Sequence, residues 1–371
     1  MTVQRRKALR WALILGALGV GAALLGLAVA ASGLIPIKAS SGHWAITEWM
    51  LHFSMKRSIA THTLGEELPP LNDPALILRG AGHYEGGCRP CHGAPGTLTP
   101  RIARAMLPPP PELTHAASKW QPEELFYIVK HGIKFTGMPA WPNQKRDDEV
   151  RAVVAFMLAM PELNATAYQQ LVYGPVPVQD NAPALAGLTA RAQRTLEGCA
   201  RCHGAHGDGR ENSAFPKLSG QRAGYMEAAL TSYADDRRMS GIMQPIAAAL
   251  DVEQRRELAS YYARAQRATP PPSSESAERI SRGREIALRG IPARRVAACK
   301  SCHGPKPDKD NPKYPLLTGQ YADYLLLQLQ LFQRGERGGS ENHHLMLKVA
   351  PRLELEQMRD VAAYYSAGAP E

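Results

Sequence analysis

The chain has 371 residues, a formal net charge of +10 and only 6% aromatic residues beside 32 Gly and 30 Pro. This length suggests two or three domains. No basic surface interleaved with aromatic side chains accompanies the positive charge, so we expect no nucleic-acid binding, and a solvated basic face that docks an acidic partner explains the charge better.

The first predicted element is a membrane-spanning helix. Residues 11–31 form a run of 21 residues without charge. At 1.5 Å per residue this run spans about 31 Å, close to the thickness of the hydrocarbon core of a bilayer. Four cations precede it and place the N-terminus in the cytoplasm: Arg5, Arg6, Lys7 and Arg10.

The alternative for this run is a cleaved signal peptide that ends at Ala28-Val29-Ala30. We favour an uncleaved anchor because the run exceeds the apolar region of about 7–15 residues that signal peptides carry. Under either interpretation, residues 32–371 are exported across the membrane.

Residues 43–57 contain two Trp, one Phe and two Met, and they end in Lys56-Arg57. This composition predicts a helix just outside the membrane. The helix either lies at the membrane interface or packs against the domain that follows, and the sequence leaves both open.

The first repeat unit surrounds Cys88-Arg89-Pro90-Cys91-His92. We expect a helix over 75–84 before the motif, another over 123–131, a loop over 132–141 and an amphipathic closing helix over 147–160. Apolar residues at helical spacing support the closing helix: Val150, Val153, Val154, Phe156 and Met157.

The second and third units resemble each other. Their motifs are Cys199-Ala200-Arg201-Cys202-His203 and Cys299-Lys300-Ser301-Cys302-His303, and both continue with P-x-L-[ST]-G-Q-x-x-x-Y and later M-x-x-x-A. Closing helices are predicted over 252–265 and 354–366. A stretch beginning at Tyr173 and a Pro/Ser-rich stretch at 269–276 read as linkers.

All six Cys lie in these three C-x-x-C-H motifs. The pattern is the attachment signal for c-type haem, since two thiols on one helical turn can bond the two vinyl groups of one porphyrin and the adjacent His can bind its iron. A structural zinc site normally needs four ligands from two neighbouring pairs, and these pairs are about 100 residues apart. A redox dithiol would require a βαβ context that is missing here.

At these motifs the chain resembles the class I cytochrome c superfamily, and units two and three resemble dihaem cytochrome c4. Unit one resembles membrane-bound cytochrome c domains, and the whole resembles three-haem cytochrome subunits of bacterial periplasmic dehydrogenases. The implied fold is all-α, with an N-terminal transmembrane helix followed by three class I cytochrome c domains. The expected divisions are 1–38 for the cytoplasmic tip and anchor, 39–70 for an amphipathic juxtamembrane segment, 71–175, 176–268 and 278–371 for the cytochrome domains, and 269–277 for a linker.

The resemblance implies three covalently bound haems c, attached through Cys88, Cys91, Cys199, Cys202, Cys299 and Cys302. It also implies His/Met ligation of each iron, by His92 and Met138, His203 and Met243, and His303 and Met346. The Met residues lie 46, 40 and 43 residues beyond their His partners. Met239 is an alternative in unit two, and His343 or His344 is an alternative in unit three.

The resemblance further implies that backbone carbonyls accept hydrogen bonds from the iron-binding histidines: those of Pro111, Pro216 and Pro315. Candidates to hold the haem propionates are Trp120, Tyr225, Tyr324, Arg237 and Arg334. We expect the remaining histidines of the haem units on surfaces or in packing rather than on iron: His83, His115, His131 and His206.

The predicted function is that of a membrane-anchored periplasmic electron carrier with no catalytic residues of its own. It would sit in the bacterial inner membrane by a single span and pass electrons from a dehydrogenase or quinol to a terminal oxidase or soluble cytochrome. The alternatives are an electron-donating subunit of a haem–copper oxidase and a peroxidase-type haem enzyme. A methionine for every iron disfavours the peroxidase, which needs an open sixth position.

Overall fold

The protein is described here by a computed structural model, which covers residues 3–35, 37–174, 188–210, 213–267, 274–304, 311–339 and 341–368. Most of the two predicted linkers, from residue 175 and over 269–273, lies outside these described residues. Every regular element within the described ranges is a helix, and two isolated bridges join Ala94 to Thr97 and Ile291 to Val296. The all-α prediction is therefore confirmed.

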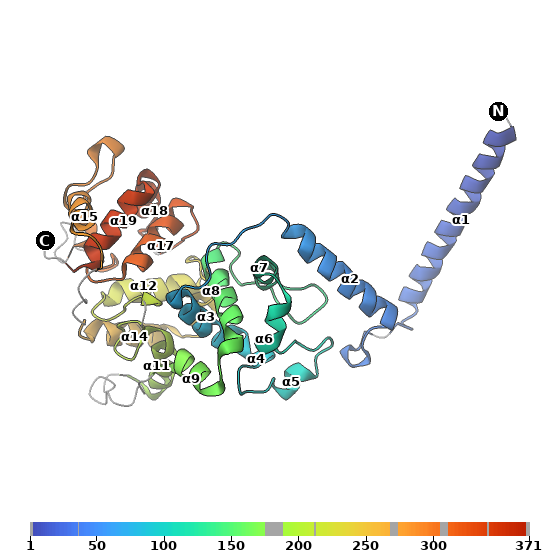
Figure 1. Cartoon of the computed structure of the whole chain (residues 1–371), viewed down its shortest axis with the longest axis horizontal. Coiled ribbons are helices and arrows are strands. Elements are labelled where there is room, and N and C mark those ends of the chain that lie inside the picture. The colour runs from blue at the N-terminus through green and yellow to red at the C-terminus, as the bar shows by residue number, and fades with distance from the viewer. Residues whose placement is uncertain are drawn as a thin grey trace.

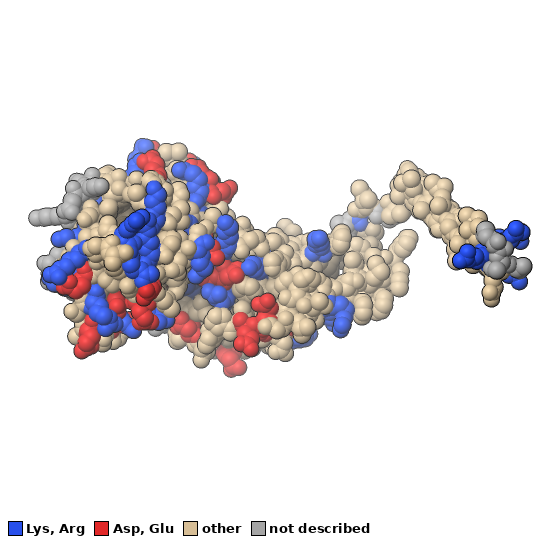
Figure 2. Space-filling model, turned by 90° about the horizontal axis from the view of Figure 1, so that it is seen from above, with Lys and Arg blue, Asp and Glu red and all other residues tan. Residues whose placement is uncertain are grey.

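Helix α1 (Val3–Ala31) projects away from a body of packed helices, and α2 (Ala45–His62) lies between the two (Figure 1). The most apolar part of α1 makes no buried contact, and α1 is the one described helix long and apolar enough to cross a membrane. Figure 2 shows Lys and Arg gathered at its free end and none along its length. Composition and length thus fit a membrane span, as they fit a signal sequence.

The two halves of helix α2 differ in burial. Its second half packs on the body, with Ile59 buried and the ring of His62 stacked on Tyr127 at 5.4 Å. Its first half exposes large apolar side chains to solvent: Trp44, Ile46, Trp49, Met50 and Phe53.

The first unit contains α3 (Pro74–Gly87), α4 (Arg89–His92), α5 (Arg101–Arg104), α6 (Leu113–Ala116), α7 (Pro122–His131), α8 (Asp147–Ala159) and α9 (Ala165–Tyr173). The Asp73 carboxylate accepts a hydrogen bond from Ala75 N–H and so caps α3, which has Pro at its first position. The closing helix α8 is buried around most of its surface, and Phe156 packs against Tyr84 and Tyr168. A side chain such as Phe156 contributes about 1.5–3 kcal/mol by leaving water.

The second unit contains α11 (Ala190–His203), α12 (Ala223–Ala234), α13 (Met243–Ala248) and α14 (Val252–Arg264). The third contains α15 (Ala277–Arg289), α16 (Lys300–His303), α17 (Ala322–Gln333), α18 (His343–Val349) and α19 (Leu355–Ser366). The predicted helices of all three units are thus confirmed, with ends shifted by a few residues.

Units one and three share the same helix crossing. Gly80 of α3 touches the backbone of α8, where an added Cβ would lie 1.8 Å from the Ala152 carbonyl oxygen. Gly283 of α15 meets α19 in the same way, 1.9 Å from the oxygen of Asp360. A side chain at either position would force the helices apart, so glycine sets how closely they cross. In both units the first cysteine of the motif packs against the core cluster that contains the closing helix, at Cys88 and at Cys299.

Candidate haem centres

Each C-x-x-C-H motif forms or ends a helical turn, at α4, at the C-terminal end of α11 and at α16. Two cysteines three residues apart on such a turn lie on one side of the helix, and the His follows directly. In unit one, the Tyr84 hydroxyl donates to the Gly93 carbonyl at 2.8 Å and so fixes the chain just after His92.

The imidazole of each motif histidine donates from Nδ1 to a proline carbonyl, as the resemblance implied. These bonds join His92 to Pro111 at 2.8 Å, His203 to Pro216 at 3.1 Å and His303 to Pro315 at 3.0 Å. Burial lowers the pKa of all three histidines, and the carbonyl bond acts in the opposite direction. A neutral ring that donates from Nδ1 leaves the Nε2 lone pair available for a metal.

The thiol of the first cysteine in each pair is hard to deprotonate. Burial raises the pKa of Cys88 and Cys199 to about 12 and that of Cys299 to about 11. Redox-active dithiols have lowered thiol pKa values and partial exposure. The raised pKa of Cys88, Cys199 and Cys299 therefore disfavours disulfide exchange at these three thiols.

One cavity of about 2330 Å³ runs through all three units. Ligand pockets for one small molecule are about 300–1,000 Å³, so this cavity has room for several large cofactors. Its lining includes all the residues predicted to attach or ligate haem: Cys88, Cys91, His92, Met138, Cys199, Cys202, His203, Met243, Cys299, Cys302, His303 and Met346. The site residues present therefore fit three haem groups in size and in donor chemistry.

The cavity separates the predicted methionine ligands from most of their alternatives. Met243 lines it, whereas Met239 lies outside the lining and instead offers its carbonyl to Arg146 at 2.7 Å. In unit three, Met346 and His343 both line the cavity. His344 is exposed and bonds the Glu341 carbonyl at 2.9 Å.

The structure adds two arginines to those predicted between units two and three. Arg237 and Arg334 are on the surface, paired with Asp235 and Glu336. Arg238 is buried and Arg337 is half-buried, and both line the cavity.

Arg238 donates to the hydroxyls of both Tyr225 and Tyr324 at 3.3 Å, and Arg337 donates to Tyr225 at 3.5 Å. Each arginine follows the tyrosine of its own unit by 13 residues. That shared spacing is the signal in the sequence that could have found them. Two cations that line the cavity would compensate haem propionates, so Tyr225 and Tyr324 stay candidates for this role.

The repeated glutamine of P-x-L-[ST]-G-Q joins units two and three symmetrically. Gln221 accepts from Leu316 N–H and donates to the Leu316 carbonyl, both at 2.9 Å. Gln320 makes the same two bonds with the backbone of Lys217, both at 3.0 Å. Leu316 and Lys217 occupy equivalent positions in the repeat, so the contact has an approximate two-fold symmetry that sequence reasoning missed.

Units one and two meet at α3. Gly82 is buried against unit two, and a Cβ on it would lie 3.0 Å from the ring of Phe215 and 3.2 Å from Cys202 Sγ. The neighbouring His83 is buried, with its ring 6.2 Å from that of Trp141. The prediction that His83 serves packing agrees with this place between the units.

Comparisons with known proteins support the same description. The family model for cytochrome c oxidase, cbb3-type, subunit III, matches residues 75–157, and the model for cytochrome c matches residues 180–265 and 291–366. A thiosulfate dehydrogenase electron acceptor of Stutzerimonas stutzeri is 36% identical over 174 residues, which are 45% of this chain and 77% of the relative. A cytochrome c4 of Thiocapsa roseopersicina is 32% identical over 170 residues, or 45% of this chain and 84% of the relative.

A solved cytochrome c4 structure from Acidithiobacillus ferrooxidans has 33% sequence identity and a TM-score of 0.40, covering 46% of this chain and 98% of the other. A thiosulfate dehydrogenase structure from Marichromatium purpuratum has 32% identity and a TM-score of 0.41, covering 45% and 36%. From the curated relatives and the motifs together, the chain belongs to the class I cytochrome c family, and it is an electron-transfer protein with covalently bound haem c rather than an enzyme.

Proposed function

We propose that the protein is a membrane-anchored carrier with three covalently bound haems c that takes electrons from a periplasmic dehydrogenase. The observation that carries this proposal is the single cavity that all three motifs and their methionines line. Bound haem supplies a one-electron iron couple. The divisions proposed for the three haem domains are 71–175, 176–268 and 278–371.

In each domain the two cysteines would hold the porphyrin, and His92, His203 and His303 would bind the iron from one side. Met138, Met243 and Met346 are proposed for the other side, in support of which all three line the cavity. A thioether ligand favours reduced iron and fills the last coordination position, which suits a carrier. His343 is the remaining alternative to Met346 as the second iron ligand in unit three.

In the proposed route of electron transfer, unit two lies between units one and three. On one side, α3 of unit one reaches Cys202 through Gly82. On the other, Arg238 and Arg337 line the cavity at the contact with unit three. Contacts on both sides of unit two make it the middle carrier of the proposed route.

Helices α1 and α2 are proposed to hold the protein at the periplasmic face of the inner membrane. The cations before α1 favour a cytoplasmic N-terminus. The exposed aromatic side chains of α2 suit the headgroup region, where Trp49 and Phe53 stack at 5.5 Å. Because the second half of α2 packs on the body, this arrangement would place unit one next to the bilayer.

The proposed electron donor is a dehydrogenase, because relatives named thiosulfate dehydrogenase electron acceptor share about a third of their aligned residues with this chain. A second candidate function, donation to a haem–copper oxidase, is favoured by the match of unit one to the cbb3-type subunit III model. The acceptor for the main proposal is a terminal oxidase or a soluble cytochrome.

Purification from membranes of a host that attaches haem c tests this proposal. The intact mass should exceed that of the apoprotein by three haems, and the haem should survive acid–acetone extraction. Two attached haems would contradict the assignment of one motif, and a soluble mature chain beginning near Ala31 would contradict the anchor. Identification of co-purified subunits separates the two candidates, since a dehydrogenase supports the first and an oxidase supports the second.

A further inference from the structure

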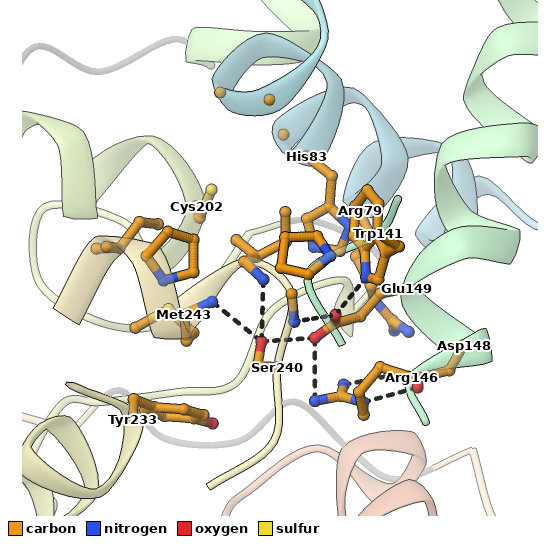
Figure 3. A pocket seen from close by; sticks show the side chains of 18 of the residues that line it. Arg79, His83, Trp141, Arg146, Asp148, Glu149, Cys202, Tyr233, Ser240 and Met243 are labelled. Carbon is orange, nitrogen blue, oxygen red and sulfur yellow. Dashed lines mark hydrogen bonds and ion pairs between the residues drawn. The ribbon is translucent and has the colours of Figure 1, made fainter. Parts of the chain in front are cut away.

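The N-termini of the three closing helices differ in how they are capped. In α14, Asp251 and Gln254 form a reciprocal capping box, and in α19 Glu354 and Gln357 form the same motif. In α8 the corresponding positions hold Arg146 and Glu149, and the Arg146 side chain caps nothing. Two charged side chains of unit one are thus released from local capping, and both turn toward unit two (Figure 3).

Glu149 is buried, with 3% of its surface exposed, and its carboxylate is fully hydrogen-bonded. It accepts from the Ser240 hydroxyl at 2.6 Å and from Gly241 N–H at 2.7 Å, both in unit two. It also accepts from Trp141 Nε1–H at 3.1 Å and pairs with Arg146 at 3.0 Å. A buried carboxylate needs several such donors, so these contacts hold one another in place.

Arg146 strengthens the same contact. Asp148 holds the guanidinium through two bonds of 2.8 Å, a bidentate geometry that fixes its direction. Its Nη1 then donates to the Met239 carbonyl of unit two at 2.7 Å. Unit one therefore binds the segment that starts at Met239 by both a cation and an anion.

The contact continues from Glu149 to the backbone of Met243. The Ser240 oxygen that donates to Glu149 accepts from Met243 N–H at 3.0 Å, at the start of α13. Gly241 lies directly on Trp141, so closely that a Cβ would approach Nε1 to 2.2 Å. Figure 3 shows Glu149, Ser240 and Met243 joined by these bonds.

We propose that Glu149, supported by Arg146, is a positioning residue for Met243, so that unit one fixes the distal methionine of the haem in unit two. The inference rests on the proposed function, in which Met243 is an iron ligand. If Glu149 and Arg146 did not hold the segment from Met239 to Met243, the thioether of Met243 would dissociate from the iron more often. Contact between the first two units thus controls the coordination of the middle haem.

The test uses the full-length protein with haem attached and compares Glu149→Ala, Glu149→Gln, Ser240→Ala and Met243→Ala. The oxidised protein is measured by the weak near-infrared sulfur-to-iron charge-transfer band and the reduced protein by carbon monoxide binding. Met243→Ala should remove about a third of the band and open one iron to carbon monoxide, since the thioether is lost from one of three haems. Glu149→Ala should act in the same direction, and Glu149→Gln and Ser240→Ala more weakly.

The matched controls are Gln254→Ala and Gln357→Ala, which remove the residue at the same helix position in units two and three. They weaken a local cap and should leave the band intact. A full band in Glu149→Ala and Ser240→Ala, with the loss in Met243→Ala retained, would overturn the positioning role alone. An unchanged band in Met243→Ala would instead overturn the ligand assignment and the positioning role together. If Glu149→Ala loses haem by mass, Ser240→Ala decides the matter, because it leaves α8 unchanged.

Discussion

The two contacts between neighbouring units are built on different principles. Units two and three meet through equivalent residues, with Gln221 and Gln320 exchanging the same pair of bonds. Units one and two meet through unlike elements, where Glu149 at a helix N-terminus binds the segment before Met243. A symmetric contact follows from repetition of one unit, whereas an asymmetric contact needs residues that only one unit carries.

The largest effect is expected from removing the middle haem. The double variant Cys199→Ser/Cys202→Ser should lose a third of the haem by mass and destabilise both contacts, because the porphyrin supplies much of the core of unit two. The corresponding variant Cys299→Ser/Cys302→Ser should disturb only the symmetric contact. Haem content and limited proteolysis measure both effects, and equal damage to unit one in the two variants would contradict this comparison.

The symmetric contact predicts equal effects from its two glutamines. Gln221→Ala and Gln320→Ala each leave a backbone N–H and carbonyl without this partner. These groups are half-buried at Leu316 and buried at Lys217, and one buried group without a partner costs about 1–3 kcal/mol. Both variants should lower the free energy of unfolding in urea by similar amounts, about 2 kcal/mol or more. A difference of more than about 1 kcal/mol between them would show that the contact is not symmetric in energy.

The sequence was sufficient for the parts that repetition and periodicity determine. These parts are the motifs and the apolar spacing of α8. The proline carbonyls beside the histidines were instead predicted from the resemblance to the class I cytochrome c superfamily. Arg238 and Arg337 were missed, although the repeat places an arginine 13 residues after each tyrosine. The role of Glu149 could not be predicted, because its partners lie about 90 residues away in another unit.

Stability at the asymmetric contact, between units one and two, should depend on pH. Burial, with Arg79 nearby, lowers the pKa of His83 from 6.5 to about 3. Between pH 6.5 and pH 3, His83 therefore binds a proton in the unfolded chain but stays neutral in the folded chain. For this reason His83 lowers the free energy of unfolding as the pH falls through this range. His83→Gln should lose less stability than the wild type between pH 7 and pH 5 in urea titrations. If both proteins lost the same amount of stability between pH 7 and pH 5, groups other than His83 would be responsible for the effect.

The smallest effect concerns how tightly α3 lies on unit two. Gly82→Ala would place a Cβ 3.0 Å from Phe215 and 3.2 Å from Cys202 Sγ, tighter than ordinary contact. Overpacking of this kind costs about 1–3 kcal/mol, and relief by a small shift of α3 would keep the cost near the lower limit. Gly87→Ala, in the same helix with no atom within 4 Å, is the matched control and should stay within about 0.5 kcal/mol of wild type. Thermal unfolding measures both variants, and the rate of electron equilibration between the haems after a light pulse should fall only in Gly82→Ala. If both glycine variants behave alike, α3 does not need its close approach to Cys202, and the asymmetric contact depends on Glu149 and Arg146 instead.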